Sequence, residues 1–183
     1  MKFNTDRIVS LSAMVVGIGS LGIIVYQTQL MRQAQHASVL PYLSVSLMAN
    51  DDGTSLLLGN TGIGPALIDD VRIRYQGREI VADPYDFYMK LRPDSKIPLG
   101  VDKLQPGRLI PAGANVRMLE SNAGGQQLLK EMLDLFEIAE VPRSWYVSAG
   151  ASGTEKAVIE ITFSSVYGDR WRIRSDRMVP ERL

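Results

Sequence analysis

The sequence contains no cysteine and a single histidine, His36. Without cysteine the chain can form no disulfide, thiolate nucleophile, iron–sulfur cluster or cysteine-ligated zinc site. One histidine leaves one candidate base for a serine–histidine triad and excludes a multi-histidine metal site. We therefore expect no metal site and no cofactor. The lack of cysteine does not decide the compartment, because a reducing cytosol and a periplasm can both hold such a chain.

The chain also lacks a charge excess and any catalytic signature. Its 183 residues carry 20 basic and 20 acidic side chains, whereas a nucleic-acid-binding domain normally shows a basic excess. No G-x-S-x-G, S-x-x-K or H-E-x-x-H motif occurs. The pair Asp69–Asp70 lies in a strand pattern, where adjacent side chains point to opposite faces. The sequence therefore predicts no nucleic-acid partner, no catalytic residue and no enzyme.

What the sequence does contain is one long apolar run, IVSLSAMVVGIGSLGIIVY, over residues 8–26. It has no charged residue and is long enough to span a bilayer. A cleaved signal peptide and a buried core helix are the alternatives. The run is long for a signal peptide, QTQLMRQ is a poor cleavage context, and a core helix apolar on every side is unusual. We expect a single-pass membrane anchor preceded by a flank over residues 1–7.

One face of this helix is lined by small residues. Ala13, Gly17 and Ser20 fall on the same side at helical spacing, which lets a second helix approach closely. Small residues are also common in membrane helices that have no partner, so both interpretations stay open. Lys2 and Arg7 precede the run and Arg32 alone follows it closely, which favours a cytoplasmic N-terminus and a periplasmic domain at a bacterial inner membrane.

Residues 27–40 connect the anchor to the rest of the chain. The segment is rich in Gln and Ala and lacks Gly and Pro, which favours a helical stalk. Pro41 ends it, because the residue before a proline avoids helical geometry.

After Pro41 the pattern changes to the period of two that is typical of strands. Leu43, Val45 and Leu47 alternate with serines, and the turn Asn50–Gly53 then predicts a hairpin. Similar patterns follow in LIDDVRIRY, EIVA, ANVRMLES, WYVSAG, AVIEITFSSV and DRWRIRS. Seven or eight short strands separated by turns predict a mainly β fold, an immunoglobulin-like β-sandwich over residues 41–183.

The glycine-rich stretch GNTGIGPA, residues 59–66, is followed by a strand pattern rather than a helix. A phosphate-binding loop needs a helix N-terminus after it, so we interpret the stretch as a connection between strands. We expect Asn60, Gly62 and Gly64 to supply positive φ angles. A small anion nest made by consecutive amides is the alternative.

The block LLLGNTGIGPALIDDVRI resembles an N-x-G-x-G-P-A element of uncharacterised bacterial single-span membrane proteins. In that group a membrane helix, a Gln/Ala-rich stalk and a PYLSV-type first strand precede an immunoglobulin-like sandwich. The resemblance covers about the first 75 residues, and its motif is short. It implies an anchored extracytoplasmic sandwich and carries over no activity.

Two segments depart from a plain sandwich. Residues 83–111 form a Pro-rich, charged excursion that begins with a short helical turn. There Tyr85, Phe87 and Tyr88 form either a partner-binding loop or a plug at one end of the core. Residues 125–139 show apolar side chains at helical spacing and predict one amphipathic helix packed on the core.

The C-terminal strand pattern places Arg170, Arg172 and Arg174 on one face. Such a row could bind phosphates or acidic headgroups. The alternative is a solvated face paired with acidic residues of the neighbouring strand.

Together these patterns favour a membrane-anchored, non-catalytic interaction module, an accessory subunit of a membrane protein complex. Its partners would be the bilayer, through residues 8–26, and a membrane protein or a second copy of the chain. The alternative is a tethered sensor that binds a small anion, such as a nucleotide, through the arginine strand.

Overall fold

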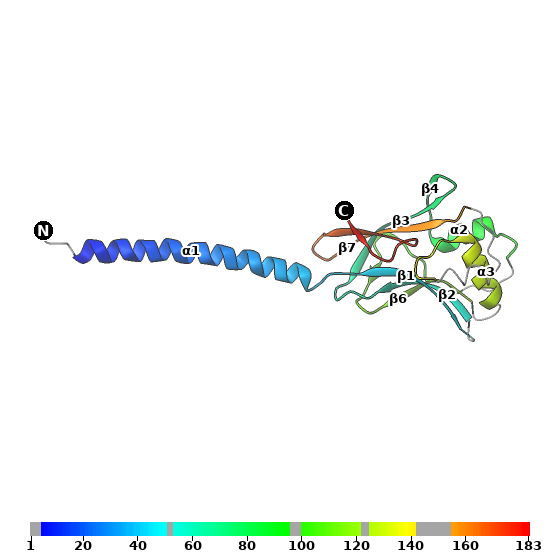
Figure 1. The fold of residues 1–183 in the computed structure, drawn as a ribbon, viewed down its shortest axis with the longest axis horizontal. Helices are drawn as coiled ribbons and strands as arrows, with labels where there is room; N and C mark the ends of the chain where they lie inside the picture. The colour runs from blue at the N-terminus through cyan, green and yellow to red at the C-terminus, as the bar shows by residue number, and fades with distance from the viewer. Residues whose placement is uncertain (1–4, 51–52, 96–99, 122–124, 142–154) are drawn as a thin grey trace. The chain divides into compact units, whose positions relative to one another are not determined.

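The computed structural model describes residues 5–50, 53–95, 100–121, 125–141 and 155–183. The chain divides into two compact units, residues 1–38 and residues 39–183. The first is a helix and the second is a β domain with two short helices, shown in Figure 1.

The first unit is one uninterrupted helix, α1, Thr5–Ala37. It contains the apolar run and most of the Gln/Ala-rich segment, in agreement with the absence of Gly and Pro between residues 27 and 40. The large apolar side chains of the run are 53% to 65% exposed, so α1 is not a core helix of the folded domain. It is long and apolar enough to cross a membrane.

The second unit contains two antiparallel sheets, which Figure 1 shows as two layers, with β3 and β7 above and β1, β2 and β6 below. The smaller sheet has the order β1-β2-β6 and the larger has the order β4-β3-β7-β8-β9, with β5 paired to β3. The strands are β1 Leu43–Asn50, β2 Gly53–Asn60, β3 Ala66–Tyr75, β4 Arg78–Val81, β5 Leu109–Ile110, β6 Asn115–Ser121, β7 Val158–Ser164, β8 Arg170–Arg174 and β9 Glu181–Arg182.

Turn chemistry sets the register of two hairpins. β1 and β2 meet at the pair Asn50↔Gly53, as the turn signal predicts. β3 and β4 are joined by Gln76 and Gly77, whose φ angles are 51° and 69°. Positive φ at both central residues matches the twist of the flanking strands.

The core lies between the two sheets. Alternate residues of each strand point inward, for example Leu43 and Leu58 from the small sheet and Ile73 and Ile161 from the large one, all 0% exposed. Two helices add to this core, α2 Pro84–Leu91 and α3 Gly125–Leu135.

The expected apolar helix and the mainly antiparallel β region are both confirmed. The predicted helix over residues 125–139 begins as expected but ends at Leu135, because the chain then pairs with a neighbouring segment. The Glu137 N–H donates to the Ala157 carbonyl at 3.0 Å, and the Ala157 N–H donates to the Leu135 carbonyl at 2.7 Å. The predicted strand WYVSAG lies outside the described residues.

Candidate functional site

The glycine-rich loop is organised by Asn60, whose side chain is buried at 1% exposure. Its Oδ1 accepts hydrogen bonds from the N–H groups of Tyr42 (3.2 Å) and Gly62 (3.1 Å). Its Nδ2 donates to three carbonyls, those of Gly64 (2.9 Å), Ile110 (3.1 Å) and Pro111 (3.2 Å). One amide therefore holds together the segment that enters the domain, the loop itself and the segment after β5.

The glycines of this loop serve close packing rather than positive φ. Asn60, Gly62 and Gly64 do not have positive φ angles, so that expectation was wrong. A Cβ atom on Gly62 would lie 2.3 Å from the Tyr42 nitrogen, and one on Gly64 would lie 1.9 Å from the Val39 oxygen. Only glycine leaves room for the entering backbone, which identifies the loop as a structural clasp around the start of the domain.

The predicted arginine row lies on β8 and is already paired with carboxylates. The pairs are Arg170 Nε with Asp69 Oδ2 (3.0 Å), Arg172 Nε with Glu160 Oε1 (3.2 Å) and Arg174 Nη2 with Asp176 Oδ2 (2.6 Å). The side chains of the three arginines are 57%, 36% and 20% exposed. An anion bound along this row would have to compete with the resident carboxylates.

The same sheet face continues this pattern of alternating charges onto β3 and β4. Arg74 Nη2 lies 3.0 Å from Glu79 Oε1 and 3.4 Å from Glu160 Oε2, while Arg72 Nε lies 2.6 Å from Asp70 Oδ2. Hydrogen bonds from the two arginines lower the pKa of Glu79, and the bond to Asp70 raises the pKa of Arg72. Most of these groups are well exposed, so each pair stabilises the fold only modestly.

The aromatic cluster at the start of the excursion lies mainly in the core. Phe87 and Tyr88, on α2, are 2% and 0% exposed, whereas Tyr85 is partly exposed. Asp83 caps α2 through the Tyr85 N–H (2.8 Å) and accepts the Leu104 N–H (2.6 Å). Burial raises the pKa of Asp83 against the opposing effect of these two bonds. Of the three aromatics, Tyr85 alone keeps part of its side chain exposed, while the rest packs against the core.

Tyr88 also makes a short polar contact between the two helices of the domain. Its hydroxyl donates to Glu131 Oε2 on α3 at 2.5 Å and lies 3.0 Å from Ser95 Oγ. Burial first, and the bond to Glu131 second, raise the pKa of Tyr88 to about 12. The contact ties α2 to α3, which is a structural role.

The small-residue face of α1 is exposed. Ala13, Gly17 and Ser20 lie on the helix surface, and a Cβ atom added at Gly17 would meet nothing within 4 Å. The structure therefore leaves this face open to a second helix.

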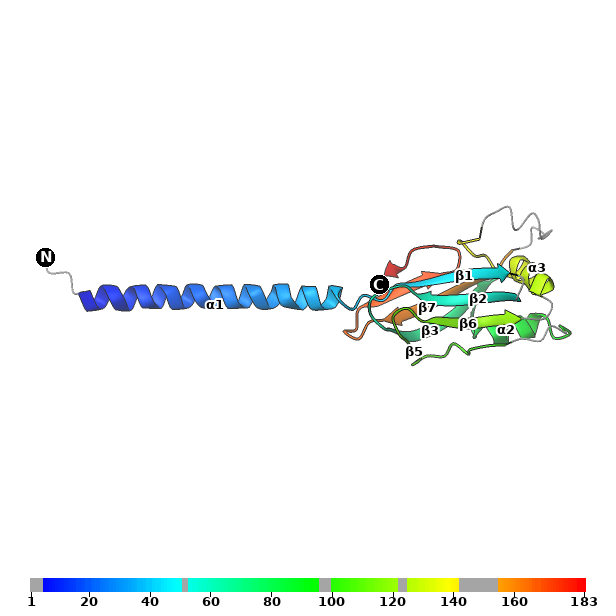
Figure 2. The same cartoon turned by 90° about the horizontal axis from the view of Figure 1, so that it is seen from below.

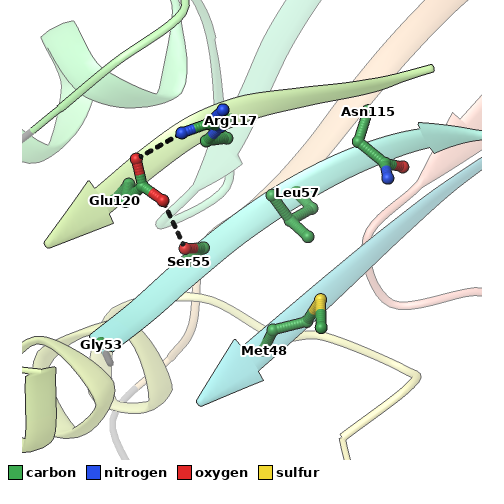
Figure 3. A pocket seen from close by; sticks show the side chains of 7 residues that line it. All are labelled: Met48, Gly53, Ser55, Leu57, Asn115, Arg117 and Glu120. Carbon is green, nitrogen blue, oxygen red and sulfur yellow. Dashed lines mark hydrogen bonds and ion pairs between the residues drawn. The ribbon is translucent and has the colours of Figure 1, made fainter. Parts of the chain in front are cut away.

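A shallow hollow on the outer face of the small sheet was not predicted. Its volume is about 320 Å³, and Figure 3 shows the side chains around it. The lining residues are Met48, Gly53, Ser55, Leu57, Asn115, Arg117 and Glu120. Glu120 joins two of them, since Oε2 lies 3.0 Å from Arg117 Nη1 and Oε1 accepts from Ser55 Oγ at 3.3 Å. The lining side chains point outward from β1, β2 and β6. Because only the register of these strands brings the side chains together, the sequence alone could not show the hollow.

Within the described residues, no group of three or more His, Asp or Glu side chains is arranged to hold a metal ion. Comparison of the chain with known protein families, with curated proteins and with solved structures finds no match.

Proposed function

We propose that the chain is a membrane-anchored interaction module, an accessory subunit whose helix lies in a bacterial inner membrane and whose immunoglobulin-like domain binds a protein partner. The observation that carries the proposal is the exposed apolar surface of α1. Side chains such as Val16 (65%) and Leu21 (63%) are covered by nothing in the chain, so lipid or another helix must cover them.

The β domain offers partners a surface of its own on the small sheet. Among the described strands β1 pairs with β2 alone, and its sequence LSVSLMAN contains no charged residue and no proline. Charged residues and proline are the usual protection of an edge strand, so β1 is suited to the addition of a partner strand. The hollow beside it, with the Arg117–Glu120 pair, would supply polar specificity.

Crosslinking in intact membranes, followed by extraction in mild detergent, tests this role. We expect the wild-type chain to be recovered in a complex of defined stoichiometry. The variant Gly17→Leu should weaken that complex if α1 packs against a second helix through its small-residue face. Gly19→Leu, the same change on the opposite side of the helix, should not. Recovery of the wild-type chain only as an uncrosslinked monomer would contradict the proposal.

Orientation can be tested separately. The basic residues before the apolar run favour a periplasmic domain, so an alkaline-phosphatase fusion after Leu183 should be active. An inactive fusion with normal membrane levels would place the domain in the cytoplasm instead.

The alternative, a tethered sensor for a small anion such as a nucleotide, receives less support because the arginine row is neutralised by carboxylates. Replacing Arg172 and Arg174 together with Glu should abolish nucleotide binding if the alternative holds, and should leave membrane assembly intact. Unaltered assembly with no nucleotide binding by the wild-type chain favours the interaction module.

A further inference from the structure

The end of the domain at which the chain enters gathers most of its exposed apolar side chains. The strand registers bring to this end the segment that enters β1 and the connections that follow β2, β5 and β7. The pairs at this end are Leu43 with Asn60, Ala66 with Ile110, and Ser164 with both Leu67 and Arg170. The Leu183 N–H also donates to the Arg170 carbonyl at 3.0 Å, which brings the C-terminus to the same end, as Figure 2 shows.

The tips of these connections form a surface that we call the apolar rim. It consists of Ile63, Leu109, Val166 and Tyr167, which are between 49% and 67% exposed. Among the other exposed large apolar side chains of the described domain, Leu40, Leu67 and Leu183 lie at the same end. Met48 and Val81 lie away from it, and Met178 and Val179 lie on the β8–β9 connection, which begins at the opposite end. Single exposed apolar residues are ordinary, but a concentration of them at one end marks a contact surface.

Arginine side chains border the apolar rim. Arg170 and Arg182 are 57% and 72% exposed, whereas their partners Asp69 and Asp169 are 22% and 20% exposed. The guanidinium groups therefore project further into solvent than the carboxylates that pair with them. Each guanidinium has five N–H donors, and the hydrogen bonds to Asp69 and Asp169 each engage one nitrogen. A lipid phosphate that competes with these carboxylates can therefore accept from the donors that they leave.

We propose that the apolar rim lies against the surface of the lipid bilayer, with its aliphatic tips among the headgroups and with Arg170 and Arg182 on lipid phosphates. This inference rests on the membrane anchoring proposed above. Apolar side chains bordered by arginine are typical of surfaces that bind the membrane interface. The apolar side chains enter the boundary of the acyl chains, and the guanidinium groups bind the anionic headgroups.

Continuity of the chain favours a bilayer over a second copy. Ser38 and Val39 alone separate the last residue of α1 from Leu40, whose carbonyl accepts the Ile63 N–H at 3.1 Å. An anchored chain is therefore always attached to a bilayer close to this end of the domain, whereas it need not meet a second copy.

Depth measurement in nanodiscs tests the proposal, and the absence of cysteine makes single labelling sites straightforward. Val166→Cys and Val81→Cys replace two valines that are 58% and 74% exposed, only the first of which belongs to the apolar rim. Each full-length variant would carry an environment-sensitive fluorophore in nanodiscs of phosphatidylcholine with or without phosphatidylglycerol, and with nitroxide-labelled lipid as the quencher.

We expect a blue shift and a loss of fluorescence for the label at residue 166 and neither for the label at residue 81. Phosphatidylglycerol should strengthen the quenching at 166, and the added pair Arg170→Glu and Arg182→Glu should weaken it. Equal quenching at the two positions would overturn the proposal.

A second copy of the chain is the other possible occupant. Protection at 166 that appears only when two copies share a nanodisc would therefore overturn the proposal as well. A chain that fails to enter nanodiscs overturns the anchoring too, whereas a chain that enters without quenching at 166 overturns only this inference.

Discussion

Replacement of Asn60 by Asp isolates the contribution of one buried amide to the stability of the domain. The change keeps the shape of the side chain and both Oδ1 contacts, to Tyr42 and Gly62, so it leaves no cavity. It removes the Nδ2 donors and turns an oxygen toward three carbonyls.

The expected loss follows from these contacts. Losing the Nδ2 donors costs about 1 kcal/mol for each hydrogen bond, and a buried group left without its partner costs about 1–3 kcal/mol, more when it is charged. We therefore expect the free energy of unfolding to fall by at least about 3 kcal/mol at neutral pH.

The deficit should also depend on pH. The carbonyls disfavour the charged carboxylate, so the pKa of the introduced acid should rise above the value of about 3.9 for an unfolded chain. A group with a raised pKa in the folded state contributes most below its unfolded pKa and loses that contribution as pH rises. The variant should thus be closest to wild type in acid and should fall further behind above about pH 4.

Urea unfolding of the full chain in detergent measures this difference, followed by tryptophan fluorescence in a Trp145→Phe background that leaves Trp171 as the one tryptophan. Trp171 stacks on Phe163 at a ring distance of 5.9 Å and so reports on core packing. Asn115→Asp is the matched control because Asn115 is exposed on the same sheet, and it should change stability by no more than about 0.5 kcal/mol. A loss below about 1 kcal/mol for the Asn60 variant, or a loss independent of pH, would refute the assignment of Asn60 as the centre of the clasp.

Two further changes test the packing around this clasp and between the helices. Gly64→Ala should lower the free energy of unfolding in urea by about 2–4 kcal/mol, because the added Cβ would lie 1.9 Å from the Val39 oxygen. Gly100→Ala is the control, since its Cβ would have its nearest contact at 3.6 Å, and it should change stability little. Similar losses for the two variants would contradict the close approach at Gly64. Tyr88→Phe should cost about 1–2 kcal/mol at neutral pH by removing the hydroxyl that donates to Glu131. Because burial raises the pKa of Tyr88 from 10 to about 12, the wild-type chain should lose stability as pH rises from 10 to 12 and the variant should lose less; parallel pH profiles would argue against the buried hydroxyl.

Local sequence patterns predicted the helices and strands better than they predicted which segments pair with one another. The alternation of Leu43, Val45 and Leu47 and the turn before Gly53 were enough for the first hairpin, since both signals are contained in adjacent residues. The end of α3 could not be read from apolar spacing, because Leu135 and Ala157 pair across a long separation in sequence. Helical periodicity carries no information about such a pairing.

The candidate surfaces show the same division. The facing of Arg170, Arg172 and Arg174 follows from strand alternation, but their pairing with carboxylates such as Asp69 depends on which strands become neighbours. The multiple hydrogen bonds of Asn60 could not be foreseen for the same reason. The glycines that follow Asn60 were the one indication in the sequence of this loop. They are needed because the backbone of another segment passes close to them, and not because they adopt positive φ angles.

The most direct test of the account is whether the intact chain remains with membranes. Lysed cells would be washed with alkaline carbonate in the absence of detergent and separated by ultracentrifugation. The exposed apolar surface of α1 predicts that the full chain stays in the membrane pellet and is released only by detergent. Recovery of the intact chain in the supernatant would contradict the membrane anchor and, with it, the proposed role.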